Sequence, residues 1–439
     1  MITRRRLLRN TARAMSAAGI ASAANWLSPS FAHAVMGGAD QFGPLGPPDA
    51  NGLMLPAGFT SRVVATSGSL VAGTQYTWHA APDGGATFEA PDGGWVYVSN
   101  SEVNATGGVG AIRFASDGTI TNAYSILTGT NRNCAGGPTP WGTWLSCEEV
   151  PHGRVYECDP MTPGSLGGLV PGLGTFNHEA VAIDAVGQRA YLTEDMGDSR
   201  LYRMTPYAYP SFSLGTMEAA EILDPQGLGP IQVGQVRPLA WHNIPQPNPP
   251  SGGVQNPTAQ PVAARATRYQ APNSTAFNGG EGCWIRDRDI YFTTKGDHRV
   301  WHIDAANDTI EIVYELASSS MPELQDPDNI FAGPNGDVYV AEDAGDLQIV
   351  ALTPSGNVVP VMQLTGVTGT EITGPALDPS GTRLYFSSQR NPGQTFEITG
   401  PFLGAPALPA MDATGRSALI GALTWLSARR LRGEAGRNT

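Results

Sequence analysis

Acidic side chains and a thiol recur at matching places along this chain of 439 residues. Glu102 and Glu148 follow short aromatic segments, and Cys134 lies in a turn rich in glycine and proline. A further set lies where other short apolar segments begin, namely Asp83, Glu179, Glu281, Asp328 and Glu371. A single acid in such a place is an ordinary turn former or a solvated charge, but recurrence at equivalent positions indicates a shared chemical role.

If these side chains converge, their chemistry is that of a metal site. Several carboxylates around one channel repel one another, and either protonation or divalent cations relieve the repulsion. Oxygen ligands in this number suit calcium, whereas a thiolate such as that of Cys134 beside carboxylates suits iron or zinc. The sequence therefore predicts a site for metal ions, in which two kinds of metal can occur together. His178, next to Glu179, is a ligand, a proton donor or a structural hydrogen-bonding residue.

The elements that position these residues are short repeated strands. The same unit, an aromatic, an aliphatic and a small residue, occurs six times, at 95–102, 142–149, 189–196, 289–296, 337–344 and 383–390. Alternation of this kind is typical of β-strands. Apolar segments that end in turns precede most copies, and hairpin patterns follow them, so each repeat is predicted to form four short antiparallel strands.

A four-stranded unit repeated radially is a propeller blade, for which about 40 to 50 residues suffice. The sequence predicts an all-β, six-bladed β-propeller of four-stranded antiparallel blades over residues 42–400, with a Pro-rich, structureless insertion at about 224–278. The segment 59–67 is a candidate outer strand of the last blade, which would close the ring. Because propellers direct the starts of their innermost strands to a central channel, the recurrent acids would converge there.

Residues 1–34 have the features of an export signal. They contain five arginines and no acid, then an apolar stretch and the small-residue site Ala32-His33-Ala34, and their opening TRRRLLR is of the twin-arginine type. We therefore predict export by the twin-arginine machinery to the periplasm or the cell exterior. The apolar run in the tail 401–439 is shorter than the ~20 residues of a membrane span, so no stable span is predicted there, but a surface helix, a frayed end or a sorting segment.

The charge of the chain limits its partners. The formal net charge is −13, and it becomes −18 without the five arginines of the predicted signal. Such a surface does not suit nucleic acid, and it repels a phosphate ester unless bound cations reverse the field locally. The sequence contains no G-x-S-x-G, H-E-x-x-H, C-x-x-C or Walker-type element, which removes the support for several familiar enzyme classes. A monomer that binds a small molecule is expected.

Four blocks of the sequence resemble the PhoX-type alkaline phosphatases. They are NCAGGPTPWGTWLSCEE at 133–149, FNHEAVAID at 176–184, PDNIFAGPNGDVYVAED at 327–343 and TGPALDPSGTRLYFS at 373–387, and the likeness covers most of residues 42–400. The resemblance implies a six-bladed propeller that holds a cluster of iron and calcium ions in its channel. It also implies hydrolysis of phosphate monoesters outside the cytoplasm.

The same resemblance implies roles for seven residues by their place in the motifs. Cys134 would be the thiolate on iron, and Glu179 and Asp328 would be carboxylates of an iron pair. The calcium ligands would be Glu102, Glu148 and Glu281, with Glu371 as an addition. In a mechanism of this kind the metal ions bind the phosphoryl oxygens and the protein mainly positions the ions.

Two positions depart from the family pattern. The family carries an arginine two residues before the glutamate equivalent to Glu281, where this chain has Gly279. A Q-H-P-G element of the family is here the segment 389–393, in which Arg390 follows the glutamine and supplies a cation. Arg390 and His178 are therefore the candidate catalytic residues. The metal-binding residues are kept and the phosphate-binding residues are changed, which places the hydrolytic activity in doubt.

Two other functions remain open on the sequence. One is a calcium-dependent propeller of the lactonase or esterase type, which the segment GGEGCW at 279–284 resembles. The other is a binding propeller in which metal ions only stabilise the structure. Arginine or lysine side chains in the channel would favour a phosphate ester, and an apolar pocket with one calcium ion would favour a lactone.

Overall fold

The computed structural model of the protein describes residues 38–250, 253 and 260–403. Strands form most of its regular structure, and its helices are single 3-10 turns: η2 (Ala39–Gln41), η3 (Pro171–Leu173), η5 (Val262–Ala264), η6 (Thr267–Tyr269), η7 (Lys295–Asp297) and η8 (Leu316–Ser318). Within these residues no helix has the length and apolar character that a membrane crossing requires. The predicted export signal at 1–34 and the tail from 404 onward lie outside the described residues, so both remain predictions.

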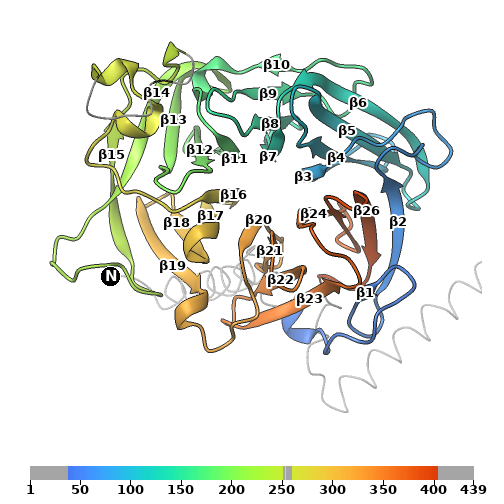
Figure 1. The fold of residues 1–439 in the computed structure, drawn as a ribbon. Helices are drawn as coiled ribbons and strands as arrows, with labels where there is room; N and C mark the ends of the chain where they lie inside the picture. The colour runs from blue at the N-terminus through green and yellow to red at the C-terminus, as the bar shows by residue number, and fades with distance from the viewer. Residues whose placement is uncertain (1–37, 251–252, 254–259, 404–439) are drawn as a thin grey trace, which may run out of the picture. The chain divides into compact units, whose positions relative to one another are not determined.

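Six innermost strands form a ring of contacts, and Figure 1 shows them around one axis. They are β3 (Pro82–Glu89), β7 (Asn133–Pro138), β11 (His178–Asp184), β16 (Gly280–Arg286), β20 (Pro327–Ala332) and β24 (Ile372–Leu377). Each contacts the next in chain order, and β24 contacts β3, so that the ring of inner strands is closed. We call each inner strand with the strands outside it a blade, numbered one to six in chain order.

The predicted aromatic repeat is the second strand of each blade. These strands are β4 (Trp95–Ser101), β8 (Trp144–Glu148), β12 (Arg189–Glu194), β17 (Asp289–Thr294), β21 (Val338–Glu342) and β25 (Arg383–Ser388). Their aromatic side chains fill the space between neighbouring sheets, as where Tyr97 of blade one stacks on Tyr385 of blade six with ring centroids 5.1 Å apart. Both rings are fully buried.

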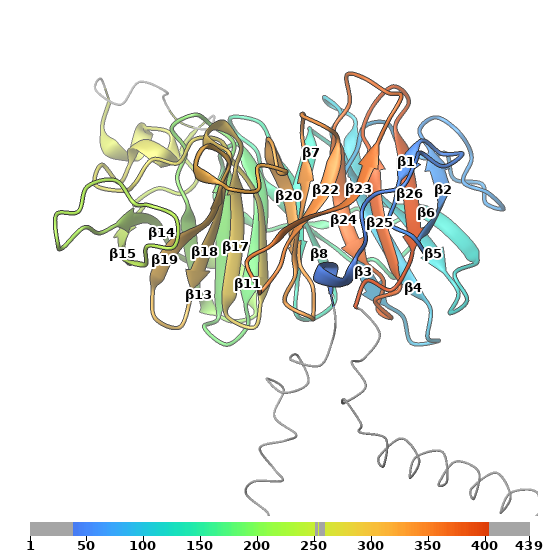
Figure 2. The ribbon, with the colours of Figure 1, turned by 90° about the horizontal axis from the view of Figure 1, so that it is seen from below.

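The outer strands complete the blades, and Figure 2 shows the propeller from the side. In chain order they are β5 (Gly107–Phe114), β6 (Ile120–Thr130), β9 (Val155–Cys158), β10 (Gly168–Leu169), β13 (Tyr202–Ala208), β14 (Ser211–Ile222), β18 (Arg299–Asp304), β19 (Thr309–Glu315), β22 (Gln348–Leu352), β23 (Val358–Leu364) and β26 (Gln394–Thr399). The predicted all-β propeller of four-stranded antiparallel blades is confirmed. The short strand β1 (Leu53–Met54) adds to the edge of β23.

Blades three and four share one sheet because of an additional strand, β15 (Arg237–Asn243). It pairs with β14 along five residues and with β19 through Arg237 and Pro238. Among the described residues the hydrogen-bonded sheets therefore number five, one of them with nine strands. The prediction of a structureless insertion at about 224–278 is wrong for this strand, since Pro-rich segments on both sides concealed its alternating pattern.

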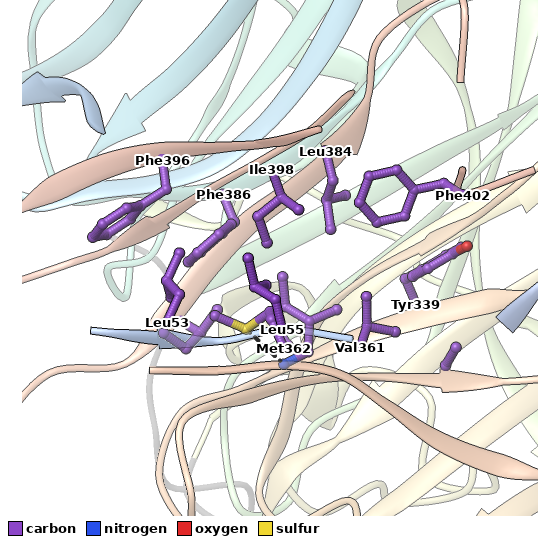
Figure 3. Close-up of a cluster of buried hydrophobic side chains, with 14 of the residues drawn as sticks. Leu53, Leu55, Tyr339, Val361, Met362, Leu384, Phe386, Phe396, Ile398 and Phe402 are labelled. Atoms are coloured by element: carbon purple, nitrogen blue, oxygen red, sulfur yellow. Dashed lines mark hydrogen bonds between the residues drawn. The ribbon is translucent and has the colours of Figure 1, made fainter. Parts of the chain in front are cut away.

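The last blade is closed by the N-terminal strand β2 (Thr60–Thr66), which pairs with β26, as predicted for the segment 59–67. Next to this closure, Phe402 packs edge-to-face against Phe59 and Phe42, with ring centroids 5.1 and 6.1 Å away. Figure 3 shows Phe402 beside Leu384 and Ile398 in the buried cluster between blades five and six. These contacts tie both ends of the described chain to one core.

We expect Phe402→Ala to lower the free energy of unfolding by about 3 kcal/mol, because the side chain is fully buried and its loss leaves a cavity at the ring closure. Leu169→Ala serves as the control, since Leu169 is 46% exposed and its truncation should cost less than about 0.5 kcal/mol. Denaturant unfolding of both variants measures the difference. Equal costs would show that the closure contributes little.

Candidate metal centre

One end of every inner strand contributes a side chain to the axis of the ring. In five strands it is the second residue, and in the sixth it is the residue directly before the strand: Asp83, Cys134, Glu179, Glu281, Asp328 and Glu371. In each of those five strands the register against the second strand shifts at this residue. Such an irregularity releases the residue from regular pairing and re-aims its side chain.

A second set of side chains comes from the residues that directly follow the second strands. These are Glu102, Glu149, Asp195, Lys295, Asp343 and Gln389. Because antiparallel neighbours reverse direction, the end of a second strand lies beside the start of its inner strand, so both sets meet at one end of the ring. Gln389 illustrates this contact, since its Nε2 donates to Asp83 at 2.6 Å and to Glu102 at 3.1 Å.

Next to this end, glycines of the inner strands pack too closely against neighbouring strands for a larger residue to replace them. A Cβ atom added to Gly84 would lie 2.5 Å from the Cα atom of Ala135. The cavity that Gly84 and other glycines of the inner strands line measures about 20 Å³, which is room for about one water molecule. The close packing of the strands therefore fixes the backbone from which the acidic residues project.

Three groups of side chains in the described part of the chain have ligand atoms within 4.8 Å of one another. They are Cys134 with Glu149 and Glu179, Asp83 with Glu102 and Glu371, and Glu179 with Glu281 and Asp328. Six of the seven predicted metal ligands belong to these groups, and Glu148 does not. Glu179 belongs to two groups and so connects two potential ion positions.

The carboxylate of Glu179 is fully buried, and neither of its oxygens has a hydrogen-bond partner among the described residues. A buried, unpaired carboxylate costs several kcal/mol unless it is protonated or binds a cation. The thiol of Cys134 contacts the carboxylate of Asp83 at 3.6 Å. An oxygen-rich set with one thiol fits hard cations together with a transition metal.

The pKa values of the acidic groups indicate that positive charge would stabilise the centre. Burial, and next the neighbouring carboxylates, raise the pKa of Asp83 and of Glu179 well above the usual carboxyl range. Burial also raises the pKa of Asp328 to about 7 and that of Glu149 to about 8, and it raises the pKa of the Cys134 thiol. Below these pKa values the four carboxyl groups therefore retain protons unless a cation replaces them.

Three basic side chains already contact this acidic centre. Arg132 contacts Glu102 and Glu149, each at 2.6 Å. Lys295 contacts Glu281 at 2.8 Å, and its Nζ lies 3.1 Å from the carboxylate of Asp343 and 3.9 Å from that of Asp195. Although burial lowers the pKa of Lys295, the carboxylates of Glu281 and Asp328 raise it above its usual value.

Arg390, predicted as a catalytic candidate, is the third of these cations. Its guanidinium contacts Glu102 at 2.5 Å and Glu371 at 3.4 Å, and its side chain is 49% exposed. Arg390 therefore lies at the solvent side of the centre, where a dissolved anion can reach it.

His178 lies away from the centre. Its ring is fully buried against Phe176, with centroids 3.6 Å apart, and its Nε2 lies 3.2 Å from the carbonyl oxygen of Gly174. Burial lowers its pKa to about 3, so the ring stays neutral. Because adjacent residues of a strand point to opposite sides, the side chain of Glu179 faces the axis and that of His178 faces the core. The structure gives His178 a packing role and no contact with the acids.

Glu148 also lies outside the three groups, and Glu149 takes the expected place. The carboxylate of Glu148 accepts the backbone N–H groups of Asn131 and Arg154, at 2.8 and 3.1 Å. Glu149 follows Trp144 by five positions, as Glu102 follows Tyr97, whereas Asp195 follows Tyr191 by four. Alignment with the first repeat therefore indicates Glu149, and alignment with the later repeats indicates Glu148.

Sequence reasoning missed Arg132 and Lys295 as members of the centre. Asp83 is among the acids predicted to converge in the channel, although the resemblance assigns it to no particular metal. Lys295 follows its second strand at the same distance as Asp195 and Asp343 follow theirs, so the alignment of repeats contains the signal for its position. Arg132 lies outside the repeat, and no sequence pattern indicates its role.

The comparisons with known proteins agree with this structure. The family model for the alkaline phosphatase PhoX matches residues 79–153 and 150–312. The structure of Pseudomonas fluorescens PhoX in complex with vanadate, a transition state analogue, superposes with a TM-score of 0.64 at 16% identity, covering 85% of this chain and 99% of that one. XC5397 of Xanthomonas campestris, a gluconolactonase, gives a TM-score of 0.47 at 11% identity, covering 82% and 98%. No curated protein matches the sequence.

Fold and site together define a β-propeller of the phosphatase type, with an acidic centre on its axis. The chain belongs to the PhoX family of alkaline phosphatases.

We expect Glu149→Gln to reduce the number of metal ions bound per chain, because an amide is a weaker ligand than a carboxylate. Glu148→Gln is the matched control, since it should retain the metal ions and lose about 1 kcal/mol of stability from one weakened backbone hydrogen bond. Elemental analysis and denaturant unfolding of both variants check this. If only Glu148→Gln lost metal ions, Glu148 and not Glu149 would be the ligand.

The metal-free protein should lose stability as the pH rises from 5 to 8. Because the folded-state pKa values of Asp328 and Glu149 lie above the ordinary carboxyl values, their contribution is complete at low pH and is lost as the pH passes about 7 and 8. The change should be on the order of a few kcal/mol. Thermal unfolding after chelation measures it, and divalent cations should restore the stability at pH 8. A melting temperature that rises over this range would contradict the account.

Proposed function

We propose that the protein hydrolyses phosphate monoesters at a cluster of iron and calcium ions on the axis of the propeller. Membership of the PhoX family supports a phosphatase, and the three ligand groups support bound metal ions. Iron is proposed for the position next to Cys134 and calcium for the positions with oxygen ligands alone, following the preferences of these metals.

The residues that would hold the ions are those of the three ligand groups described above. Bound metal ions would supply positive charge to the phosphoryl oxygens and activate an oxygen nucleophile. The chain itself positions the carboxylates from a rigid ring of strands, excludes most water beyond the site and directs basic side chains to the open side. Fixed charges of this kind stabilise the transition state without reorganisation.

The position of two cations, Lys295 and Arg390, next to the ligand groups is the observation that supports the proposal most directly. Both are cations that contact the ligand groups, Lys295 at Glu281 and Arg390 at Glu102 and Glu371. A phosphate ester offers several anionic oxygens, and a lactone offers none. Two cations next to the metal ligands therefore favour phosphate over the lactonase alternative and over a centre that only stabilises the structure.

Lys295 also compensates for the departure at Gly279. A Cβ atom built on Gly279 would lie 3.8 Å from the Cβ of Lys295, so both side chains would start from one place. The backbone N–H of Lys295 donates to the carbonyl oxygen of Gly279 at 2.8 Å. With φ at +70°, residue 279 favours glycine. We propose that Lys295 provides the cation that the family places on residue 279, so that catalysis is retained.

Export remains part of the proposal. The sequence of residues 1–34 supports transport by the twin-arginine machinery to the periplasm or the cell exterior. The twin-arginine route transports folded proteins, so a centre of iron and calcium ions could assemble in the chain before export.

Lys295→Met should reduce kcat/KM for p-nitrophenyl phosphate about 100-fold, which is the loss expected for one preorganised charge in a transition state. The metal content should stay unchanged, and Lys295→Arg should recover part of the rate because it keeps the charge. Elemental analysis and initial-rate measurements on the wild-type protein, Lys295→Met and Lys295→Arg test this prediction. A fully loaded wild-type protein without turnover would contradict the proposed function, and an unaffected Lys295→Met would contradict the role of Lys295.

A further inference from the structure

A pocket of about 460 Å³ opens between blades five and six, next to the acidic centre. Two loops form its walls, residues 343–347 after β21 and residues 367–371 before β24. Arg390 lines it as well. Its volume lies in the range of sites that bind small organic molecules.

The pocket and the acidic centre share residues. Glu371 lines the pocket and belongs to the ligand group with Asp83 and Glu102. Arg390 lines the pocket and contacts Glu102 and Glu371. A phosphoryl group held at the metal ligands and at Arg390 would therefore have the remainder of its ester directed into this pocket.

The pocket wall is held in place by hydrogen bonds to the segment that contains Arg390. The backbone N–H of Arg390 donates to Thr370 Oγ1 at 2.9 Å. The side-chain amide of Asn391 donates to the carbonyl oxygens of Thr368 and Gly369 at 3.2 and 2.7 Å. The loop 367–371 is thus fastened to the site before a ligand binds, which lowers the ordering cost of binding.

The walls combine apolar and neutral polar groups. Leu347 and Val367 line the pocket and pack against the buried cluster between blades five and six. Thr368 and Thr370 add hydroxyl groups. Among the described lining residues Arg390 is the one cation, and it already contacts two carboxylates, whereas Asp343 and Glu371 are acidic. A second anionic group on the ligand would meet these acids.

We propose that this pocket is the subsite for the alcohol part of the ester. It would accept neutral, partly apolar groups about the size of an aromatic ring or a sugar, and it would disfavour polyanions such as nucleoside triphosphates. The inference rests on the proposed function, because it takes the phosphoryl group to lie at the metal ligands.

The test uses phosphonates, which retain the phosphate-like head and are not hydrolysed at their P–C bond. Binding of phenylphosphonate and methylphosphonate to the metal-loaded full chain is measured by calorimetry. We expect the wild-type protein to bind phenylphosphonate about tenfold more tightly, because the ring buries apolar area. Thr368→Trp, on the exposed rim of the pocket, should remove this preference and change methylphosphonate affinity less than about twofold. Thr121→Trp, on an exposed outer strand, is the matched control.

Two results would overturn the subsite and leave the proposed function intact. One is equal affinity of the wild-type protein for both phosphonates, a result that needs no variant. The other is equal weakening of both ligands in Thr368→Trp. If neither phosphonate nor inorganic phosphate binds the loaded wild-type protein, the proposed function fails together with the subsite.

Discussion

Mutual repulsion of buried carboxylates is the constraint on which this structure depends. Asp83, Glu179, Glu281 and Asp328 project from four of the six inner strands towards one end of the axis, and the oxygens of Glu179 have no hydrogen-bond partner there within the described chain. No packing of neutral side chains relieves such a charge density. The site is stable only with protons, basic side chains or metal ions, and the basic side chains Arg132, Lys295 and Arg390 neutralise part of it.

The propeller makes this concentration of charge possible. Each blade repeats the same two positions, one at the start of the inner strand and one after the second strand, and the ring brings them to one end of the axis. Closely packed glycines below the site and the closure by β2 hold the ring to its size. The apolar clusters between the blades therefore supply the folding energy that holds the acids together, in groups that could bind metal ions.

Much of this arrangement was predictable from the sequence, and the exceptions have physical reasons. The aromatic repeats predicted the second strands, and acids at strand starts predicted most of the ligand groups, because period and position in a blade are local properties. Glu148 was predicted in place of Glu149 because the repeats differ by one residue in the distance from the aromatic side chain to the axial one, five in the first two repeats and four in the others. Arg132 and the strand β15 depend on contacts between distant segments, which no local pattern records. His178 was also a catalytic candidate, although the alternation of side chains along a strand directs it away from the axis once Glu179 faces the axis.

We propose that the acidic centre holds metal ions, with iron bound to the thiolate of Cys134. X-ray absorption at the iron edge of the loaded protein tests it most directly, compared with Cys134→Ser. The account predicts a sulfur scatterer next to iron in the wild-type protein and its loss in the variant. Absence of iron, or a sulfur contribution that persists in Cys134→Ser, would contradict it.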